Sequence, residues 1–200
     1  MVKIKLSALA CAILVGGQQL VAEDSNNIID LGNSVGKSVD INKETKIITG
    51  TTTDATINVD NNGKLISRVP SFFQAGINIK NNSNAIFENE ISMQWPYFHI
   101  TDNSTAVFNK TLSITGDDED GWPVIEQDND FSGGSLWLNN NSTLDIKKEA
   151  IFNETSVLIN HGSTAKIGNL YDSGSKIYVV NKSELKINED AEFDVTHLIV

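Results

Sequence analysis

The chain repeats a short pattern about every twenty residues, and this period limits the folds that it can adopt. Each copy holds two strand-like segments joined by an Asn-rich turn. Aligned on one residue of the turn, the copies have their anchors at Gly63, Ser83, Ser104, Ser142, Ser163 and Ser183. The intervals between these anchors are 20, 21, 38, 21 and 20 residues. Self-similarity at a fixed period of this size is typical of a solenoid.

Apolar residues occupy the same places in nearly every copy. They lie six and four residues before the anchor and two and four residues after it, as period-two alternation on one face of two strands requires. Around Ser83 these residues are Ile77, Ile79, Ala85 and Phe87. Ser67, in the first copy, is the single departure. The pattern therefore predicts two strands per copy that turn one face toward a common core.

A third short alternation follows eight and ten residues after most anchors. Its members are Ile91 and Met93, Leu112 and Ile114, Ala150 and Phe152, and Ala191 and Phe193, whereas Tyr171 and Ser173 hold these places after Ser163. Three short strands cannot bury their own apolar face, so each unit needs neighbours above and below it. The pattern predicts a parallel β-helix with three short strands per rung of about 20 residues and rungs about 4.8 Å apart. An antiparallel β-sandwich of successive hairpins is the alternative, and the constant period favours the coil.

Asn residues gather in the turn just before the anchor. The turn columns read Asn62, Asn82, Asn103 and Asn141, preceded by Asn61, Asn81, Asp102, Asn140 and Asn181. Asn tolerates left-handed backbone geometry and hydrogen-bonds to its own backbone in turns. Stacked Asn side chains also form ladders along a repeating axis. The Asn enrichment thus has a structural cause before any functional one.

Residues 1–22 have the order of a secretory signal peptide. Lys3 and Lys5 form a basic start, residues 6–15 form an apolar run too short to span a bilayer, and cleavage after Ala22 would leave Glu23 first. The alternative is a buried N-terminal helix. The only cysteine, Cys11, lies in this segment, so we expect an exported mature chain without disulfides or a thiol nucleophile.

The charge of the chain argues against nucleic acid as a partner. The formal net charge of −11 becomes about −13 when Lys3 and Lys5 are removed. Acidic residues are spread along the chain, and no stripe of Lys and Arg is present to neutralise phosphates. A distributed negative charge most often keeps an extended surface soluble.

The repeat divides the chain into segments. Residues 23–50 are polar and less regular, and we expect them to cap the first edge, which an open solenoid would otherwise expose. Residues 51–200 hold the rungs, and the long interval after Ser104 contains residues 115–134, whose Gly, Pro and acid content predicts an inserted loop more than a degenerate rung. The run His197 to Val200 ends on an apolar strand without a cap, which predicts that the coil is incomplete at its C-terminus.

The strongest candidate for a chemical site is an acidic cluster within the insertion. It consists of Asp117, Asp118, Glu119 and Asp120, with Asp128 and Asp130 nearby. Carboxylates on a loop can bind Ca²⁺, but the spacing matches no EF-hand or calcium-binding repeat, which favours a solvated loop. Paired carboxylates also suggest a polysaccharide-active β-helix enzyme, a lyase or hydrolase. Against it, these acids are local in sequence and Arg68 is the only arginine.

The three histidines show neither metal-ligand spacing nor a Ser/His/Asp arrangement. His99, His161 and His197 lie at unrelated places in the rung, and His99 should point outward between Phe98 and Ile100. They are interpreted as surface histidines. We therefore predict no catalytic residue, no cofactor and no metal site, and expect the chain not to be an enzyme.

Aromatic residues at outward positions are the candidates for a binding surface. Trp137 and Tyr178 share the place of His99, five residues before the anchor, while Trp95, Tyr97 and Trp122 lie in or near irregular segments. Exposed aromatic side chains mark surfaces that bind sugars or partner proteins. The alternative is that the inserted loop covers them.

The repeat resembles the passenger domain of an autotransporter, the type V secretion systems of Gram-negative bacteria. The segments NNSNAIFENEISM, DNSTAVFNKTLSI, NNSTLDIKKEAIF and NKSELKINEDAEF carry the resemblance, together with the signal-like N-terminus and the lack of cysteine after it. It covers roughly residues 50–200 and rests on the style of the repeat. The resemblance implies a right-handed β-helix.

What the resemblance implies about function is export and display at the cell surface. An adhesin-like passenger would contact a host-cell surface protein or glycan, or neighbouring bacterial cells. It would reach the outer membrane through a C-terminal barrel, which these 200 residues lack. Adhesion or another surface interaction without catalysis is thus the expected role, and the polysaccharide-active enzyme is the alternative.

Overall fold

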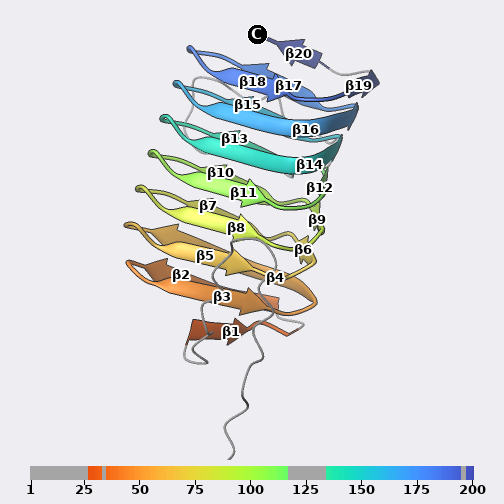
Figure 1. Cartoon of the computed structure of the whole chain (residues 1–200). Coiled ribbons are helices and arrows are strands. Elements are labelled where there is room, and N and C mark those ends of the chain that lie inside the picture. The colour runs from red at the N-terminus through yellow and green to blue at the C-terminus, as the bar shows by residue number, and fades with distance from the viewer. Residues whose placement is uncertain (1–26, 33–34, 117–133, 195–196) are drawn as a thin grey trace, which may run out of the picture.

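The chain forms a parallel β-solenoid of about 7 turns with roughly 21 residues per turn, as a computed structural model shows (Figure 1). The structure describes residues 27–32, 35–116, 134–194 and 197–200. In Figure 1 the strands on the near side run from left to right while the chain climbs, so the coil is right-handed. The predicted fold class, including the parallel pairing, is confirmed.

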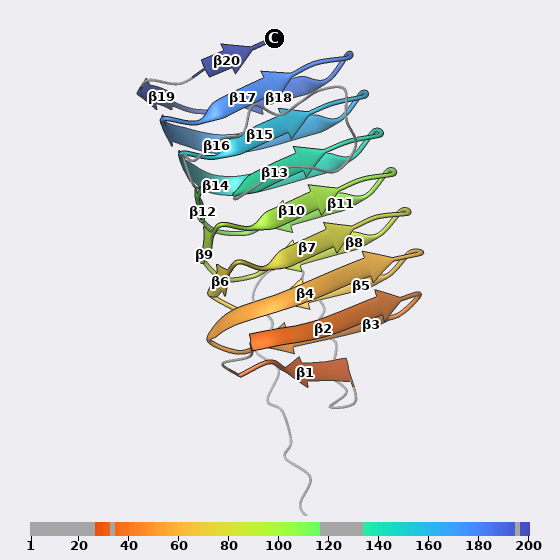
Figure 2. The same cartoon turned by 180° about the vertical axis from the view of Figure 1, so that it is seen from behind.

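Two sheets make up the wall of the coil, and we call them sheet A and sheet B. Sheet B contains β2 (Val35–Asn42), the later part of β4 (Thr52–Asp60), β7 (Gly76–Ile79), β10 (Tyr97–Ile100), β13 (Ser135–Leu138), β15 (Ser156–Ile159), β17 (Lys176–Val179) and β20 (His197–Ile199). Figure 2 shows these strands on the near side of the molecule. Each pairs in parallel with the equivalent strand of the next rung.

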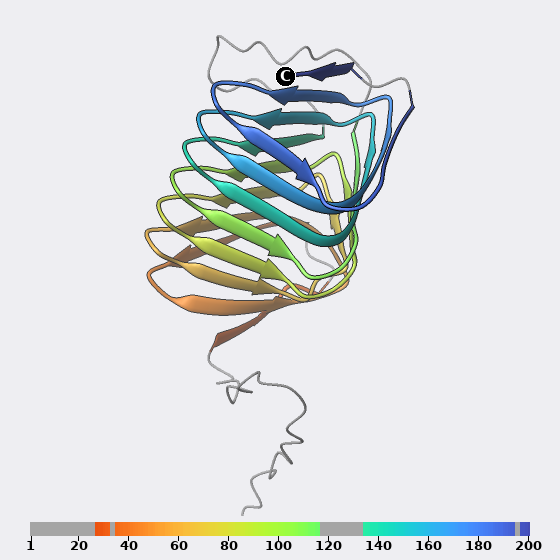
Figure 3. The same cartoon turned by 45° about the horizontal axis from the view of Figure 1, so that its top comes forward.

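Sheet A supplies the other two strands of each rung. Its first limb contains β1 (Ile28–Asp30), β3 (Thr45–Thr49), β5 (Lys64–Ser67), β8 (Asn84–Phe87), β11 (Thr105–Phe108), the first parts of β14 (Thr143–Asn153) and β16 (Thr164–Ser173), and β18 (Glu184–Ile187). Its second limb contains the start of β4, β6 (Ser71–Phe73), β9 (Ile91–Gln94), β12 (Leu112–Thr115), the later parts of β14 and β16, and β19 (Ala191–Asp194). Figure 3 shows the rungs stacked as turns of one coil.

The core is a set of columns formed by the inward residues of successive rungs. Phe98 of β10 lies over Ile77 and under Leu136, as the register of the strands dictates. The rings of Phe87 and Phe108 stack with their centroids 4.3 Å apart, and Phe98 meets both edge-on. Full burial of each such side chain contributes roughly 1.5–3 kcal/mol, so the columns hold the rungs together.

The anchor serines form a hydrogen-bonded ladder inside the Asn-rich turn, which joins each strand of sheet B to the first limb of sheet A. The amide N–H of Ser83 donates to Ser104 Oγ at 3.1 Å, that of Ser104 to Ser142 Oγ at 3.3 Å, and that of Ser142 to Ser163 Oγ at 3.1 Å. All four serines are buried. A hydroxyl column therefore satisfies backbone donors that the sharp turn would leave unpaired.

Gly63 replaces serine in the first copy because its surroundings are tighter. A Cβ atom there would lie 2.5 Å from the carbonyl oxygen of Ile41. Its own N–H donates to the carbonyl oxygen of Asp60 at 2.9 Å, so it needs no hydroxyl acceptor. The exception to the anchor pattern is thus a steric one.

The Asn-rich turns place two successive residues in the left-handed region. Asn81 and Asn82 have φ of 56° and 61°, and Asn140 and Asn141 have 54° and 58°. The side-chain ladder in this corner is staggered: Asn81 donates to Asp60 Oδ1 at 2.7 Å, and Asn140 to Asp102 Oδ1 at 2.8 Å. Acids in neighbouring turns thus take part in the amide ladder.

The third alternation after Ser163 is shifted by one residue from the predicted places. Leu170 and Asp172 point inward, and Tyr171 is 39 % exposed. The cause is a bulge in β14 after Ile146, where β14 holds one residue more than the paired strand β16. Gly168 of β16 lies close against this bulge, since a Cβ atom at Gly168 would lie 2.2 Å from the carbonyl oxygen of Lys148. The third alternation is thus present after Ser163, but Leu170 and Asp172 carry it in place of Tyr171 and Ser173.

The segment that interrupts the repeat leaves the coil and rejoins it at one point. β10 and β11 pair directly with β13 and β14, so the rung before the interruption stacks on the rung after it. A Cβ at Gly134 would lie only 2.3 Å from Gly116 Cα, a distance that only glycine permits. Of the predicted loop 115–134, Thr115 is the last residue of β12, Gly116 and Gly134 lie against each other, and residues 117–133 lie outside the described residues.

The regular coil begins within residues 23–50, the segment that the sequence predicts to be a cap. β2 and β3, between residues 35 and 49, pair in register with β4 and β5 of the following rung. Val39 and Ile41 are buried in the sheet-B columns. Among the described residues, no helix is long and apolar enough to cross a membrane.

Candidate functional site

The outward face of sheet B carries a column whose chemistry changes along the coil. Its members stand opposite one another in register: Asp40, Asn58, Asn78, His99, Trp137, Leu158 and Tyr178. The column is polar at the N-terminal rungs and aromatic or aliphatic at the C-terminal rungs. The change occurs between Asn78 and Trp137, where His99 lies.

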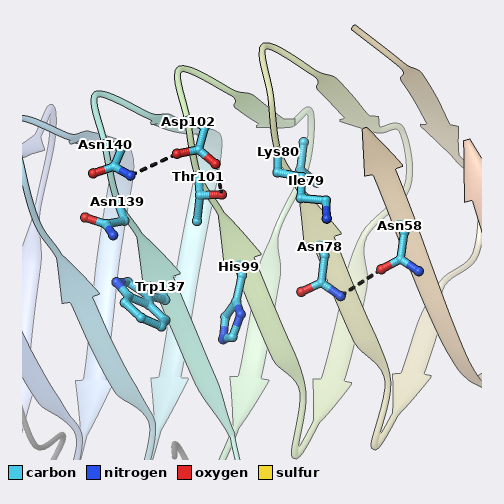
Figure 4. A pocket seen from close by; sticks show the side chains of 10 residues that line it. All are labelled: Asn58, Asn78, Ile79, Lys80, His99, Thr101, Asp102, Trp137, Asn139 and Asn140. Atoms are coloured by element: carbon cyan, nitrogen blue, oxygen red, sulfur yellow. Dashed lines mark hydrogen bonds between the residues drawn. The ribbon is translucent and has the colours of Figure 1, made fainter. Parts of the chain in front are cut away.

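The polar half of this column is an amide ladder. Asn58 Nδ2 donates to Asp40 Oδ1 at 2.7 Å, and Asn78 Nδ2 donates to Asn58 Oδ1 at 3.0 Å. Because both amides donate toward the N-terminal end, Asn78 Oδ1 remains at the other end and faces the side of His99 (Figure 4). Among the described residues, no donor reaches this oxygen. The ladder thus ends in an open acceptor.

His99 and Trp137 form an aromatic pair across adjacent rungs. Their ring centroids are 5.2 Å apart with an interplanar angle of 81°, so one ring meets the other edge-on. Burial lowers the pKa of His99 below its ordinary value, since desolvation disfavours the imidazolium. Nε2 of this ring is enclosed, with no hydrogen-bond partner among the described residues. The imidazole is therefore neutral near pH 7.

These side chains line a groove that crosses β4, β7, β10 and β13. Its volume is about 490 Å³, and its lining includes Asn78, His99 and Trp137 on one side and Lys80, Thr101 and Asn139 on the other. Figure 4 shows them projecting from successive strands. A hollow of about 410 Å³ continues the groove toward β2 and shares Asn58 and Lys80 with it.

The rim of the groove holds a second set of hydrogen bonds. Thr101 Oγ donates to Asp102 Oδ2 at 3.1 Å, and Asn140 Nδ2 donates to Asp102 Oδ1 at 2.8 Å. Asn139 Oδ1 lies 2.8 Å from His161 Nδ1. These contacts use one end of each carboxamide, and the described residues leave Asn140 Oδ1 and Asn139 Nδ2 open.

The described lining of the groove holds one Lys and one Asp, Lys80 and Asp102. Lys80 is the only Lys or Arg among its described lining residues, and its Nζ lies 3.4 Å from Asp60 Oδ2. The side-chain amide of Asn81 first, and then the Asn61 N–H and the Lys80 ammonium, hold the pKa of Asp60 below its ordinary value, against an opposing effect of burial. Among its described lining residues, the groove therefore offers no unpaired Lys or Arg for an anionic ligand.

The aromatic residues singled out from the sequence lie in different places. Trp137 lines the groove. Trp95 is 36 % exposed in the turn between β9 and β10, where it packs against Phe73 and donates from Nε1 to the Gly116 carbonyl at 3.1 Å. Tyr97 is 41 % exposed at the start of β10, outside the groove lining. The structure thus does not bring Trp95 and Tyr97 into the groove.

The other two aromatic residues singled out from the sequence, Tyr178 and Trp122, are not part of the described groove lining. Tyr178 is only 2 % exposed, although it stands in the outward column, and burial raises the pKa of its hydroxyl. Trp122 lies outside the described residues, as do Asp117, Asp118, Glu119, Asp120, Asp128 and Asp130. Among the residues that are described, no group of three or more His, Cys, Asp and Glu side chains could hold a metal ion.

Sequence reasoning missed most of the groove. It placed Asp102 and Asn140 in the turn columns and interpreted His99 as a surface histidine, and it did not single out Asn78, Thr101 or Asn139. The sequence did hold a sign of the groove, because His99 and Trp137 both lie five residues before their anchor serines. This shared position places the two side chains next to each other when the rungs stack. No family model, curated protein or solved structure matches the chain.

Proposed function

We propose that the chain is a segment of an exported, cell-surface or secreted β-helical passenger, and that its role is adhesion or surface interaction without catalysis. The observation that carries the proposal is the groove around His99 and Trp137, where the outward face departs from its amide ladder. Stacking requires apolar inward columns and ordered turns, but it does not require an indole and an imidazole outside.

The residues that line the groove favour ligand binding over catalysis. Asp102 is its only described carboxylate, and both oxygens of Asp102 accept hydrogen bonds from Thr101 and Asn140. General acid and base catalysis of glycosidic cleavage uses a pair of carboxylates on either side of the bond. A lone carboxylate held in this way is suited to positioning other groups.

The resemblance to autotransporter passengers supports display at the surface. Such a segment would present its lateral face along the whole coil, and the N-terminal residues 1–22 have the order of a cleavable leader. Partners would be a glycan or protein on a host cell or on neighbouring bacterial cells.

The test of this proposal has an export part and a binding part. The full chain is expressed in a Gram-negative host, and the N-terminus of the product is read by mass spectrometry. We expect a mature chain that begins at Glu23, and a product still beginning at Met1 would contradict export. The purified protein, coated on a surface, should then retain bacterial or animal cells above an albumin control. Failure to retain cells of either kind would overturn the adhesive role, and release of sugar from polysaccharides would favour the enzyme.

A further inference from the structure

We infer that His99 is an acid-sensitive switch in the groove across β4, β7, β10 and β13. The neutral imidazole stays packed against Trp137, whereas the imidazolium turns away from it toward Asn78 and changes the shape of the groove. This inference rests on the proposed function, because it names the regulation of the same site. It is carried by the enclosed ring nitrogen of His99, the open oxygen of Asn78 and the charges of the groove.

The enclosure of the His99 ring admits the neutral imidazole but not the imidazolium. Nε2 is enclosed and has no hydrogen-bond partner among the described residues. In the neutral ring one nitrogen carries no proton, so Nε2 need not donate. Both nitrogens of the imidazolium carry a proton, which would leave a charged N–H buried without an acceptor. Burial accordingly lowers the pKa of His99. Protonation therefore requires the ring to move.

Asn78 offers the ring a second place on the same face. Asn78 and His99 stand opposite each other in the register of β7 and β10. Because Asn78 Nδ2 donates to Asn58 Oδ1 at 3.0 Å, Asn78 Oδ1 is left on the side of His99 (Figure 4). A charged N–H of His99 that turns toward this oxygen would form a charge-assisted hydrogen bond, which is stronger than a neutral one. The groove thus provides one arrangement for each protonation state of the ring.

The movement of His99 would change the groove without unfolding the coil. The rings of His99 and Trp137 meet edge-on with their centroids 5.2 Å apart, so turning the imidazole breaks this contact. Both residues line the groove. Phe98 and Ile100, on either side of His99 in β10, are fully buried and point to the opposite face of the strand. The element with two arrangements is therefore a single side chain outside the core.

The charged groups around His99 do not hold the imidazolium in place. β4 and β13 contribute no charged residue to the described lining. Lys80, which follows β7, is a cation paired with Asp60 at 3.4 Å. Asp102, which follows β10, already accepts hydrogen bonds on both of its oxygens. Tyr97, also outward on β10, lies outside the groove lining. Among the described residues no carboxylate forms an ion pair with His99, so only movement of the ring relieves the charge.

The other two histidines do not share this enclosure. His161 and His197 are both exposed. His161 Nδ1 lies 2.8 Å from Asn139 Oδ1, and this oxygen can accept a hydrogen bond from Nδ1 whether the ring is neutral or charged. Histidine is the side chain whose charge ordinarily changes in mild acid. The response of the groove to mild acid is therefore assigned to His99.

The first experiment follows the ring hydrogens of the histidines in the full chain by NMR, from about pH 7.5 to about pH 5. The resonance that is missing from His99→Phe identifies His99, and His161→Gln is the matched control. We expect a nuclear Overhauser contact between His99 and Trp137 at neutral pH. It should disappear as His99 gains its proton, while the far-ultraviolet circular dichroism spectrum stays the same.

Three results of this titration would overturn the switch. The first is a contact between His99 and Trp137 that persists after His99 is protonated. The second is a His99 resonance that titrates near the ordinary histidine value of about 6.5, since the ring would then not be enclosed. The third is loss of the circular dichroism signal over the same pH range, because the chain would then unfold as a whole.

A second experiment tests the arrangement with Asn78. Asn78→Asp places a carboxylate where the imidazolium is expected to turn, and it should raise the midpoint of the His99 titration by about one pH unit or more. The fold should tolerate an acid there because Asp40 holds the same column two rungs away. Asn84→Asp is the control, since it adds the same charge at an exposed position on sheet A. An unchanged midpoint in Asn78→Asp, or an equal rise in Asn84→Asp, would overturn this arrangement.

A third measurement connects the switch to the proposed function and separates the two. Retention of cells by the coated protein is measured at neutral pH and in mild acid, and each variant is compared with its own value at neutral pH. We expect retention to fall several-fold in acid for the wild type and for His161→Gln, but not for His99→Phe. Equal retention by the wild type at both pH values, or an equal fall for His99→Phe, overturns the inference and leaves adhesion standing. Absence of retention at both pH values overturns the proposed function, and the NMR titration then decides whether the switch exists.

Discussion

The inward and outward faces of sheet B follow the repeat to different degrees. Along the inward face one column runs Ile57, Ile77, Phe98, Leu136, Val157 and Ile177, and all of these residues are buried and apolar. The neighbouring outward column passes from amide to imidazole to indole over three rungs. The stacking of rungs dictates the first column but leaves the second free. Stability therefore comes from the columns that repeat, and the proposed binding site lies where the outward column changes.

The largest expected effect comes from the inward face. Phe98→Ala removes a fully buried ring that contacts Phe87 and Phe108, and it should lower the free energy of unfolding by about 3–5 kcal/mol. Phe193→Ala is the matched control, because Phe193 is 41 % exposed and should cost far less. Chemical denaturation followed by circular dichroism measures both. Equal losses for the two variants would contradict the core that we describe.

A smaller loss is expected in the serine ladder. Ser142→Ala removes the acceptor of the Ser104 amide N–H and leaves that donor buried, which should cost about 1–3 kcal/mol of unfolding free energy. Ser113→Ala, on the outward side of β12, is the control and should be nearly neutral. If the two serine variants unfold at the same denaturant concentration, the ladder does not stabilise the corner.

The smallest effect concerns the pH dependence of His99. Its folded pKa is lowered by burial, so between that pKa and the ordinary value near 6.5 the unfolded chain binds more protons than the folded chain. The penalty is absent above the unfolded pKa and grows as the pH falls through this window. We expect His99→Phe to lose less stability than the wild type between neutral and mildly acidic pH. Parallel curves of unfolding free energy against pH for the two proteins would show that His99 is not buried as described.

The sequence was enough to predict the coil because its period and its apolar positions are imposed by stacking itself. The registers Ile77 to Phe98 and Phe98 to Leu136 follow directly from the anchors at Ser83, Ser104 and Ser142. The position of Tyr171 could not be predicted in this way, because the bulge beside Gly168 shifts the strand by one residue and flips its side chains to the other face.

The groove was harder to predict because its polar residues also serve the repeat. Asn78 and Asn139 lie five and three residues before their anchors, outside the turn columns, but asparagine is so common in the repeat that its type alone marks no site. Only the direction of their hydrogen bonds shows which oxygen or nitrogen stays open. The sequence also does not predict how exposed an outward side chain is. Tyr178 is buried, whereas Trp137, in the same column, lines the groove.

The most direct test of the account compares cell retention by Trp137→Leu and Tyr171→Leu, with the unfolding free energy measured on the same samples. The account predicts that Trp137→Leu loses retention while its unfolding free energy stays close to that of the wild type, and that Tyr171→Leu keeps both. Full retention by Trp137→Leu, or an equal loss of retention by Tyr171→Leu, would contradict the claim that the binding site lies where the outward column of sheet B departs from its amide ladder.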